Sequence, residues 1–356
     1  MMKRFIILLS LITLLSLPLF GEEKVYEQSK LKRVKINFGK IIKLSIISPK
    51  GSIQLIKSKD EVIVNAVFTI TSNSKDSLKS SLDLSSIDIR KDKDKIIIEA
   101  KVPRNYVSYN QVILNQPEEL ENAVRKISKK KTDFDAVTVD FYVTIPEKIK
   151  FIYLENSSGS IDISGISSDL KINSKHGELN IENVKGDIDI KHSYGDITLI
   201  KIDGDISLDN SHGRVFIKQA NNITVKNSYK AVLVEEVEGD ISIENKNADV
   251  KLKKVRLHKT KRDSTKRVKV QNRTGNIIIY PEKKPSITLK AKSNSGLISC
   301  DYPIQSTVSD EDELSGIIGD GDVFVELETY DAEIKIIEKS ETDSKKKSEG
   351  KGERSD

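Results

Sequence analysis

The chain has a single cysteine, no tryptophan and only 5% aromatic residues among its 356 residues. Because Cys300 has no partner, no internal disulfide is possible, and the fold must rest on burial and backbone hydrogen bonds. We expect Cys300 to be a small buried side chain rather than a reactive thiol. The shortage of aromatic side chains and the absence of gathered carboxylates argue against a polysaccharide-degrading enzyme, which needs paired carboxylates or a Lys/Arg base and normally has aromatic platforms for sugars.

No charge of one sign dominates either. The chain holds 59 Lys and Arg against 54 Asp and Glu, a formal net charge of +5. A small excess spread over so many ionisable groups does not predict a nucleic-acid partner.

One apolar run is present, at residues 5–20, directly after Met-Met-Lys-Arg. It is interrupted by Pro18 and is shorter than the roughly 20 apolar residues of a bilayer span. A basic start, a short apolar stretch and Gly21 before a charged segment predict a signal peptide over residues 1–21, with an uncleaved anchor as the alternative. We therefore expect an exported chain, in the periplasm, on the cell surface or secreted.

From residue 157 to 255 a phrase of the type Gly-Asp-Ile-x-Ile returns about every nine residues. Apolar residues at its third position should point inward, because side chains alternate along a strand. They are Ile161, Leu170, Leu179, Ile188, Ile197, Ile206, Val215, Ile223, Val232, Ile241 and Val250. Two kinds of turn alternate, so the repeat predicts an all-β, right-handed β-solenoid of β-roll type, with about 18 residues and two strands per rung.

The turns between strands carry columns of similar side chains. Glycine recurs there because such a tight reversal commonly needs a positive φ, and the turns at Lys230 and Ala248 should relax. Equivalent residues should stack from rung to rung at about 4.8 Å. One column comprises Asn156, Ser174, His192, Asn210, Asn227 and Asn245, and a second, directly before the glycine, comprises Ser158, His176, Tyr194, His212, Tyr229 and Asn247.

Outside the strict repeat the same pattern continues. Alternating segments at 62–70, 95–102 and 140–145 predict longer strands, and further turns and strands are expected near 48–55, 272–277, 293–296 and 332–336. The solenoid domain should span 22–337. Three segments interrupt or follow it: an amphipathic helix at 117–130, an irregular basic connection at 253–273 and a disordered tail at 338–356.

The order of these phrases resembles a known family. Residues 139–146 (Val-Asp-Phe-Tyr-Val-Thr-Ile-Pro), 154–161 (Leu-Glu-Asn-Ser-Ser-Gly-Ser-Ile), the Gly-Asp-Ile turns and Gly-Asp-Gly-Asp at 319–322 carry the resemblance. Over residues 36–337 the chain is similar to the bacterial "putative adhesin" β-solenoid family of unknown function, and more remotely to the head domain of autotransporter adhesins. The resemblance implies an exported or envelope-attached protein, and some relatives act in envelope stress sensing. It implies no catalytic residue and no cofactor.

The aromatic and imidazole column is the best candidate for a site. His176, Tyr194, His212 and Tyr229 are expected to stack at successive turns, with a contact patch for a partner as the alternative. A shared metal ion is excluded because His176 and His212 would lie about 10 Å apart, two rungs from each other.

Acidic residues form a column at the second series of turns, at Asp169, Asp187, Asp205 and Asp240. We expect these carboxylates to accept hydrogen bonds from the amides of their own turns, with weak divalent-cation binding as the alternative. The acidic segment 310–313 and the Gly-Asp-Gly-Asp segment should form a solvated loop, again with calcium as the alternative.

The basic connection suggests a third site. Its default interpretation is a solvated loop, and the alternative is contact with an anionic surface through Lys259, Lys261, Arg262, Lys266 and Arg267. The partner would be an anionic envelope polymer, a lipid surface or another envelope protein. Taken together, the sequence predicts an exported, non-catalytic binding, adhesion or scaffold module of the cell envelope. An envelope-stress sensor is the alternative, and a polysaccharide-acting β-helix enzyme ranks behind both.

Overall fold

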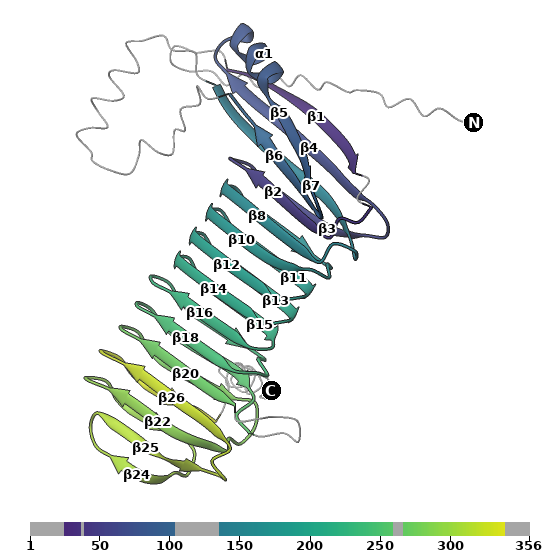
Figure 1. Cartoon of the computed structure of the whole chain (residues 1–356). Coiled ribbons are helices and arrows are strands. Elements are labelled where there is room, and N and C mark those ends of the chain that lie inside the picture. Colours follow the sequence, from purple (N-terminus) through teal and green to yellow (C-terminus); the bar gives the residue numbers. More distant parts are fainter. Residues whose placement is uncertain (1–24, 37–38, 104–134, 259–265, 339–356) are drawn as a thin grey trace, which may run out of the picture. The chain divides into compact units, whose positions relative to one another are not determined.

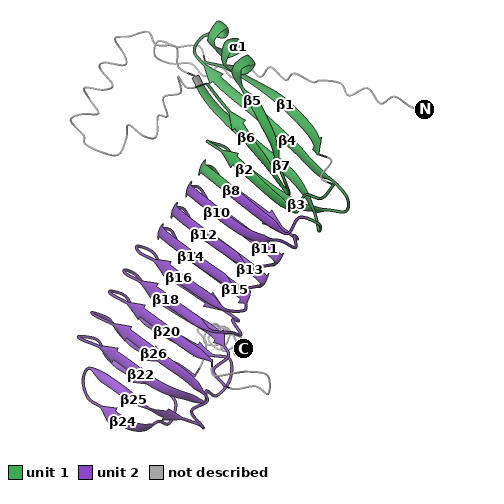
Figure 2. Ribbon diagram, viewed as in Figure 1, with its two compact units in different colours: residues 1–148, 155–159 green, residues 149–154, 160–356 purple. Residues whose placement is uncertain are grey.

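The computed structural model describes residues 25–36, 39–103, 135–258 and 266–338. This part of the chain is mostly β-strand, with one short helix (Figure 1). It divides into two compact units (Figure 2): unit 1 comprises residues 1–148 and 155–159, and unit 2 comprises residues 149–154 and 160–356. The predicted signal peptide, the helix predicted at 117–130 and the tail from 339 onward lie outside the described residues.

Unit 2 consists of two long, mainly parallel sheets whose strands alternate along the chain. The first sheet has the order β9 (Ile161–Ser164), β11 (Leu179–Lys185), β13 (Ile197–Asp203), β15 (Val215–Ala220), β17 (Val232–Glu235), β19 (Val250–Val255), β21 (Ile277–Pro281), β27 (Ile334–Ile336) and β23 (Ile298–Cys300). The second has the order β10 (Asp169–His176), β12 (Ile188–Tyr194), β14 (Ile206–His212), β16 (Ile223–Asn227), β18 (Ile241–Asn245), β20 (Arg267–Asn272), β26 (Val323–Thr329), β22 (Ile287–Ser293), β25 (Glu313–Ile318) and β24 (Gln305–Ser309). The division between the units falls within β8 (Phe151–Ser158).

The strand register stacks equivalent apolar residues on one another. Ile188 pairs with Leu170 on one side and with Ile206 on the other, and Leu179 pairs with Ile197 in the facing sheet. All eleven residues predicted to point inward are at most 2% exposed, which confirms that part of the sequence analysis. Burial of each such side chain contributes about 1.5–3 kcal/mol, so these columns form the core.

Glycine is required where neighbouring turns touch. Gly195 has a φ of +137°, and a Cβ atom there would lie 2.0 Å from the carbonyl oxygen of Gly177. At the equivalent place Ala248 has a φ of +73°, in the left-handed region that an L residue can adopt at some cost. The turn therefore changes conformation where glycine is missing.

Unit 1 contains the helix and two series of paired strands. One series has the order β1 (Tyr26–Ile36), β4 (Val62–Ser72), β7 (Asp135–Pro146) and β3 (Ile53–Ser58), and the other has the order β2 (Lys43–Ser48), β6 (Lys95–Lys101) and β5 (Ser86–Asp92). The strands predicted at 62–70, 95–102 and 140–145 are confirmed as β4, β6 and β7.

The helix α1 (Lys75–Leu84) packs against β4 and β1. It begins where the Ser74 hydroxyl accepts a hydrogen bond from the amide of Ser77, and it buries Leu78 and Leu82 one turn apart. The sequence analysis missed this helix. A serine cap four residues before a Leu pair with i, i+4 spacing was the signal that could have found it.

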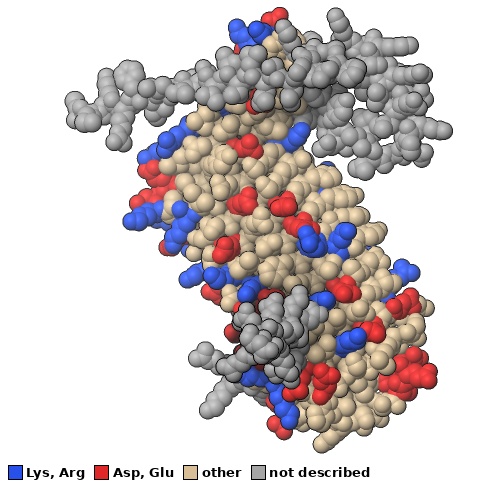
Figure 3. All heavy atoms as spheres, turned by 180° about the vertical axis from the view of Figure 1, so that it is seen from behind, with Lys and Arg blue, Asp and Glu red and all other residues tan. Residues whose placement is uncertain are grey.

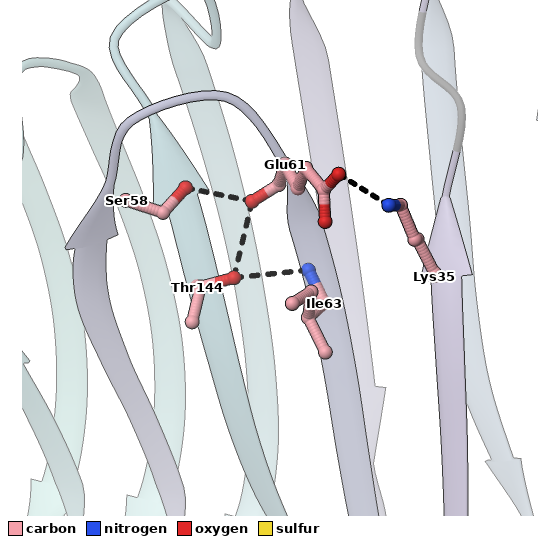
Figure 4. A network of polar contacts seen from close by, with 5 residues as sticks. All are labelled: Lys35, Ser58, Glu61, Ile63 and Thr144. Atoms are coloured by element: carbon pink, nitrogen blue, oxygen red, sulfur yellow. Dashed lines mark hydrogen bonds and ion pairs between the residues drawn. The ribbon is translucent and has the colours of Figure 1, made fainter. Parts of the chain in front are cut away.

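A polar network closes the turn between β3 and β4 (Figure 4). The carbonyl oxygen of Glu61 accepts hydrogen bonds from the hydroxyls of Ser58, at 2.7 Å, and Thr144, at 3.1 Å. The same Thr144 hydroxyl oxygen accepts from the amide of Ile63 at 3.0 Å, and the Glu61 carboxylate forms an ion pair with Lys35. The network ties together β1, β4, β7 and β3, four adjacent strands of unit 1, and has a structural role.

Two expectations need correction here. The basic connection is shorter than predicted, because Lys253 and Lys254 belong to β19 and Arg267 already begins β20. Cys300, in β23, is only half-buried, although burial does raise the pKa of its thiol. Its position near the edge of the first sheet explains the incomplete cover.

Candidate functional site

Four rings stack on one another at successive turns of unit 2. The ring centroids of His176 and Tyr194 are 4.9 Å apart, those of Tyr194 and His212 are 4.6 Å apart, and those of His212 and Tyr229 are 4.2 Å apart. The planes differ by 10°, 19° and 16°. We call these four residues the ring stripe. The stacking predicted from the sequence is confirmed.

The ring stripe is exposed to solvent. Tyr194 and Tyr229 are 46% and 53% exposed, and both imidazoles are exposed as well. Because each ring covers the face of the next, the inner rings present their edges to solvent, with phenol hydroxyls and imidazole nitrogens. The result is a row of groups that both donate and accept hydrogen bonds. Each stacked pair is worth about 0.5–1.5 kcal/mol beyond burial, so stacking stabilises the row.

An ion pair joins two of the turns beside the ring stripe. The Arg214 guanidinium lies 2.7 Å from a carboxylate oxygen of Asp196, and the Arg214 amide donates to the other oxygen at 2.8 Å. Burial alone would raise the pKa of Asp196, but the hydrogen bonds from Arg214 hold it below its usual value. Lys175 and Lys230 lie next to the stripe in sequence and are also exposed.

Directly beneath the turns runs a buried polar column. The side-chain amide of an asparagine donates to the carbonyl oxygen three residues later and so closes its own turn. The pairs are Asn210 with Gly213, Asn227 with Lys230, Asn245 with Ala248 and Asn272 with Gly275, at 2.7–3.1 Å. In unit 1, Asn156 makes the same bond to Gly159.

His192 occupies one place in this column and is 4% exposed. Burial lowers the pKa of His192, while the nearby carbonyl groups of Ser174 and Gly177 favour the proton. Burial of the ring thus disfavours the protonated form of His192 within the fold.

The acidic column at the other turns links neighbouring rungs. Asp169 accepts a hydrogen bond from the amide of Asp187, and Asp187 accepts one from the amide of Asp205, both at 2.9 Å. Asp240 accepts from the amide of Arg267 at 2.9 Å. We expected these carboxylates to accept hydrogen bonds from the amides of their own turns. That expectation is wrong, because each of these amides belongs to the next turn. These hydrogen-bond partners are brought together by strand pairing, so the spacing of residues within one turn does not reveal them.

The second acidic segment forms a tight loop between β24 and β25. One carboxylate oxygen of Asp310 accepts from the amides of Asp312 and Glu313, at 3.0 and 2.7 Å. In the described residues no group of three or more His, Cys, Asp or Glu side chains is placed to hold a metal ion.

The predicted basic site is only partly described. Lys259, Lys261 and Arg262 lie outside the described residues. Lys266 is 6% exposed, and its ammonium group donates to the carbonyl oxygen of Glu238 at 2.8 Å, so the expectation that it lies in a solvated loop is wrong. Arg267 is exposed. On the face drawn in Figure 3, basic and acidic side chains are interspersed.

Ion pairs between neighbouring strands were not found from the sequence. On the second sheet Lys171 and Asp189 approach to 3.1 Å, and Lys269 and Glu326 approach to 3.4 Å. Such exposed pairs contribute little stability, about 0–1 kcal/mol each, but they neutralise the outer face. None of the helices in the described ranges has the length and apolar character needed to cross a membrane.

Comparison with known proteins identifies a family. The family model described as Toastrack DUF4097 matches residues 56–280 and 232–337. A comparison with curated proteins finds no match.

Three solved structures are similar over most of this chain. A "putative cell adhesion protein" from Clostridium sporogenes is 12% identical, with 88% of this chain and 100% of that chain covered and a TM-score of 0.23. A "putative adhesin" from Bacteroides fragilis is 8% identical, with 86% and 97% covered and a TM-score of 0.31. Another from Parabacteroides merdae is 10% identical, with 87% and 97% covered and a TM-score of 0.28.

Proposed function

The chain belongs to the Toastrack DUF4097 family, and from this premise we propose that it is an exported, non-catalytic module of the cell envelope that binds a linear envelope polymer. Its solenoid is right-handed, with about 18 residues and two strands per rung. Registers such as Leu170 with Ile188 support that rung length. The handedness follows the strong preference of parallel strand connections for the right-handed crossover.

The observation that carries the binding role is the ring stripe. It presents hydrogen-bonding ring edges at four consecutive turns, at intervals of 4.2–4.9 Å. A polymer laid along the turns would meet the same kind of group at every rung, so weak contacts would add up along its length. Exposed Lys175 and Lys230 near the two ends favour an anionic polymer.

The test compares the two tyrosines of the ring stripe with an exposed tyrosine outside it. The double variant Tyr194→Ala and Tyr229→Ala removes half of the ring stripe. The control is Tyr330→Ala, because Tyr330 is 56% exposed at another turn of unit 2 and is not part of the stripe. We expect the double variant to lose at least about tenfold in cosedimentation with purified cell-wall material, and the control to bind like the wild type. Equal binding by all three proteins would contradict the assignment of the ring stripe.

The basic connection is a second candidate contact. The salt dependence of binding distinguishes it from the ring stripe. Neutralising Lys259, Lys261 and Arg262 together tests it, while Lys266 is left unchanged because it is buried. Attraction by exposed charges is screened beyond about 8 Å at physiological salt, so binding through this segment should fall steeply as salt rises. Binding through hydrogen-bonding ring edges should fall much less. Vesicles with and without anionic lipid show whether a lipid surface can replace the polymer.

Export and lack of catalysis are tested separately. Cell fractionation should place the protein outside the cytoplasm, and sequencing of its N-terminus should begin at Glu22. Incubation with charged polysaccharides should release neither reducing ends nor unsaturated products. An envelope-stress sensor or regulator is the alternative function, and in that case the ring stripe variant would lose a protein partner rather than the polymer.

A further inference from the structure

The outer face of the first sheet of unit 2 has an apolar centre. Phe216 pairs with Thr198 on one side and with Leu233 on the other, and Ile200 lies next to them on β13. These outward side chains are half-buried by their neighbours on the sheet. In the same region Lys218 approaches Glu235 to 3.9 Å and Glu236 to 3.8 Å, so its charge is paired within the chain.

Opposite charges lie at the two ends of this centre. Asp162 and Glu182, on β9 and β11, form an acidic end, whereas Lys251 and Lys253, on β19, form a basic end. All four side chains occupy the same outward columns as the apolar centre, as their registers show. In the described part of the chain, none of the four makes an ion pair. Elsewhere on the outer faces, as between Lys171 and Asp189, neighbouring opposite charges do pair.

We propose that this face, which we call the graded face, docks a second copy of the same chain in antiparallel orientation. A two-fold axis along the strand direction would put the acidic end of one copy over the basic end of the other, twice in each dimer. It would also lay the apolar centres around Phe216 on each other. The parallel arrangement would place like charges together and is disfavoured. A second copy fits because the charges of the graded face are complementary to those of the same face after the two-fold rotation.

The size of the graded face sets the expected strength. Six strands at about 4.8 Å spacing extend roughly 24 Å, and five residues along a strand extend about 16 Å. That footprint, on the order of 400 Å², is about half of what a standard interface buries on each partner. The dimer should therefore be weak and should form at high local concentration, as at a cell surface.

The experiment is a charge exchange followed by mixing. One variant carries Asp162→Lys with Glu182→Lys, and the other carries Lys251→Glu with Lys253→Glu, both in the full chain. Sedimentation velocity over about 1 to 500 µM measures association of each protein alone and of the 1:1 mixture, with the range chosen for a small interface. Far-UV circular dichroism confirms that each variant is folded.

We expect the wild type to associate reversibly and each variant alone to remain monomeric. The mixture should associate again, because the all-basic face then meets the all-acidic face. The variant Phe216→Ser should weaken wild-type association at least tenfold. A monomeric wild type over the whole range would overturn the proposal, and so would wild-type-like association of both variants. Since the ring stripe shares no residue with the graded face, failure here leaves polymer binding unaffected, and failure of polymer binding leaves the dimer unaffected.

Discussion

Substitution of Ile206 by aspartate should destabilise unit 2 severely, whereas the same change one residue later should be tolerated. Ile206 is 2% exposed and pairs with Ile188 and Ile223 in the adjacent strands of its sheet. Ser207 points to the opposite side of the sheet and is exposed. The two positions share a strand, a rung and a backbone environment, so only the direction of the side chain differs.

The expected magnitude follows from what each site loses. Truncation of a buried Ile costs about 2–5 kcal/mol, and an unpaired buried polar group adds to that cost. Ile206→Asp should therefore lower the free energy of unfolding by about 4 kcal/mol or more. Ser207→Asp places a second carboxylate opposite Asp189 and should cost less than about 1 kcal/mol, while Ser207→Lys should be close to neutral.

Urea unfolding followed by far-UV circular dichroism is the suitable assay, because the chain has no Trp to report by fluorescence. The midpoint is the quantity to compare, since repeat arrays need not unfold in one step. A large midpoint shift for Ile206→Asp with a small one for Ser207→Asp would support the register. Similar shifts for the two variants would refute the assignment of inward and outward columns.

Three further outcomes are expected. Gly195→Ala should destabilise by about 3 kcal/mol, because the new Cβ would meet the Gly177 carbonyl, while Ala248→Gly should change the urea midpoint little; equal effects would contradict the close turn contact. The pKa of His192 is lowered by burial, so the unfolded chain takes up a proton first, and stability should fall as pH drops through about 6.5 toward the folded-state pKa. His192→Asn should flatten this part of the pH profile, and an unchanged profile would show that another group is responsible. Deletion of residues 185–202 should lower the melting temperature less than deletion of nine residues, and the reverse order would rule out a two-strand rung.

The repeat and its inward columns could be predicted from the sequence because both are local properties. Alternation along a strand and the return of Gly-Asp-Ile need only a few consecutive residues, and burial of one face then follows from hydrophobicity. The ring stripe could be predicted for the same reason, since His176, Tyr194 and His212 recur at one phase of the repeat. The short helix was missed because its signal, a serine cap and two leucines, is weak by itself.

Only the tertiary structure decided which groups meet between rungs. Pairing of strands placed the amide of Asp187 on Asp169 and the carbonyl oxygen of Glu238 on the ammonium group of Lys266. It also holds non-glycine residues such as Lys201 and Gln219 at a φ of 57°, a left-handed conformation that local propensity disfavours. The graded face likewise exists only because strands far apart in sequence lie in register. Local periodicity determined the strands and their buried faces, and the stacking of rungs determined the neighbours of each side chain.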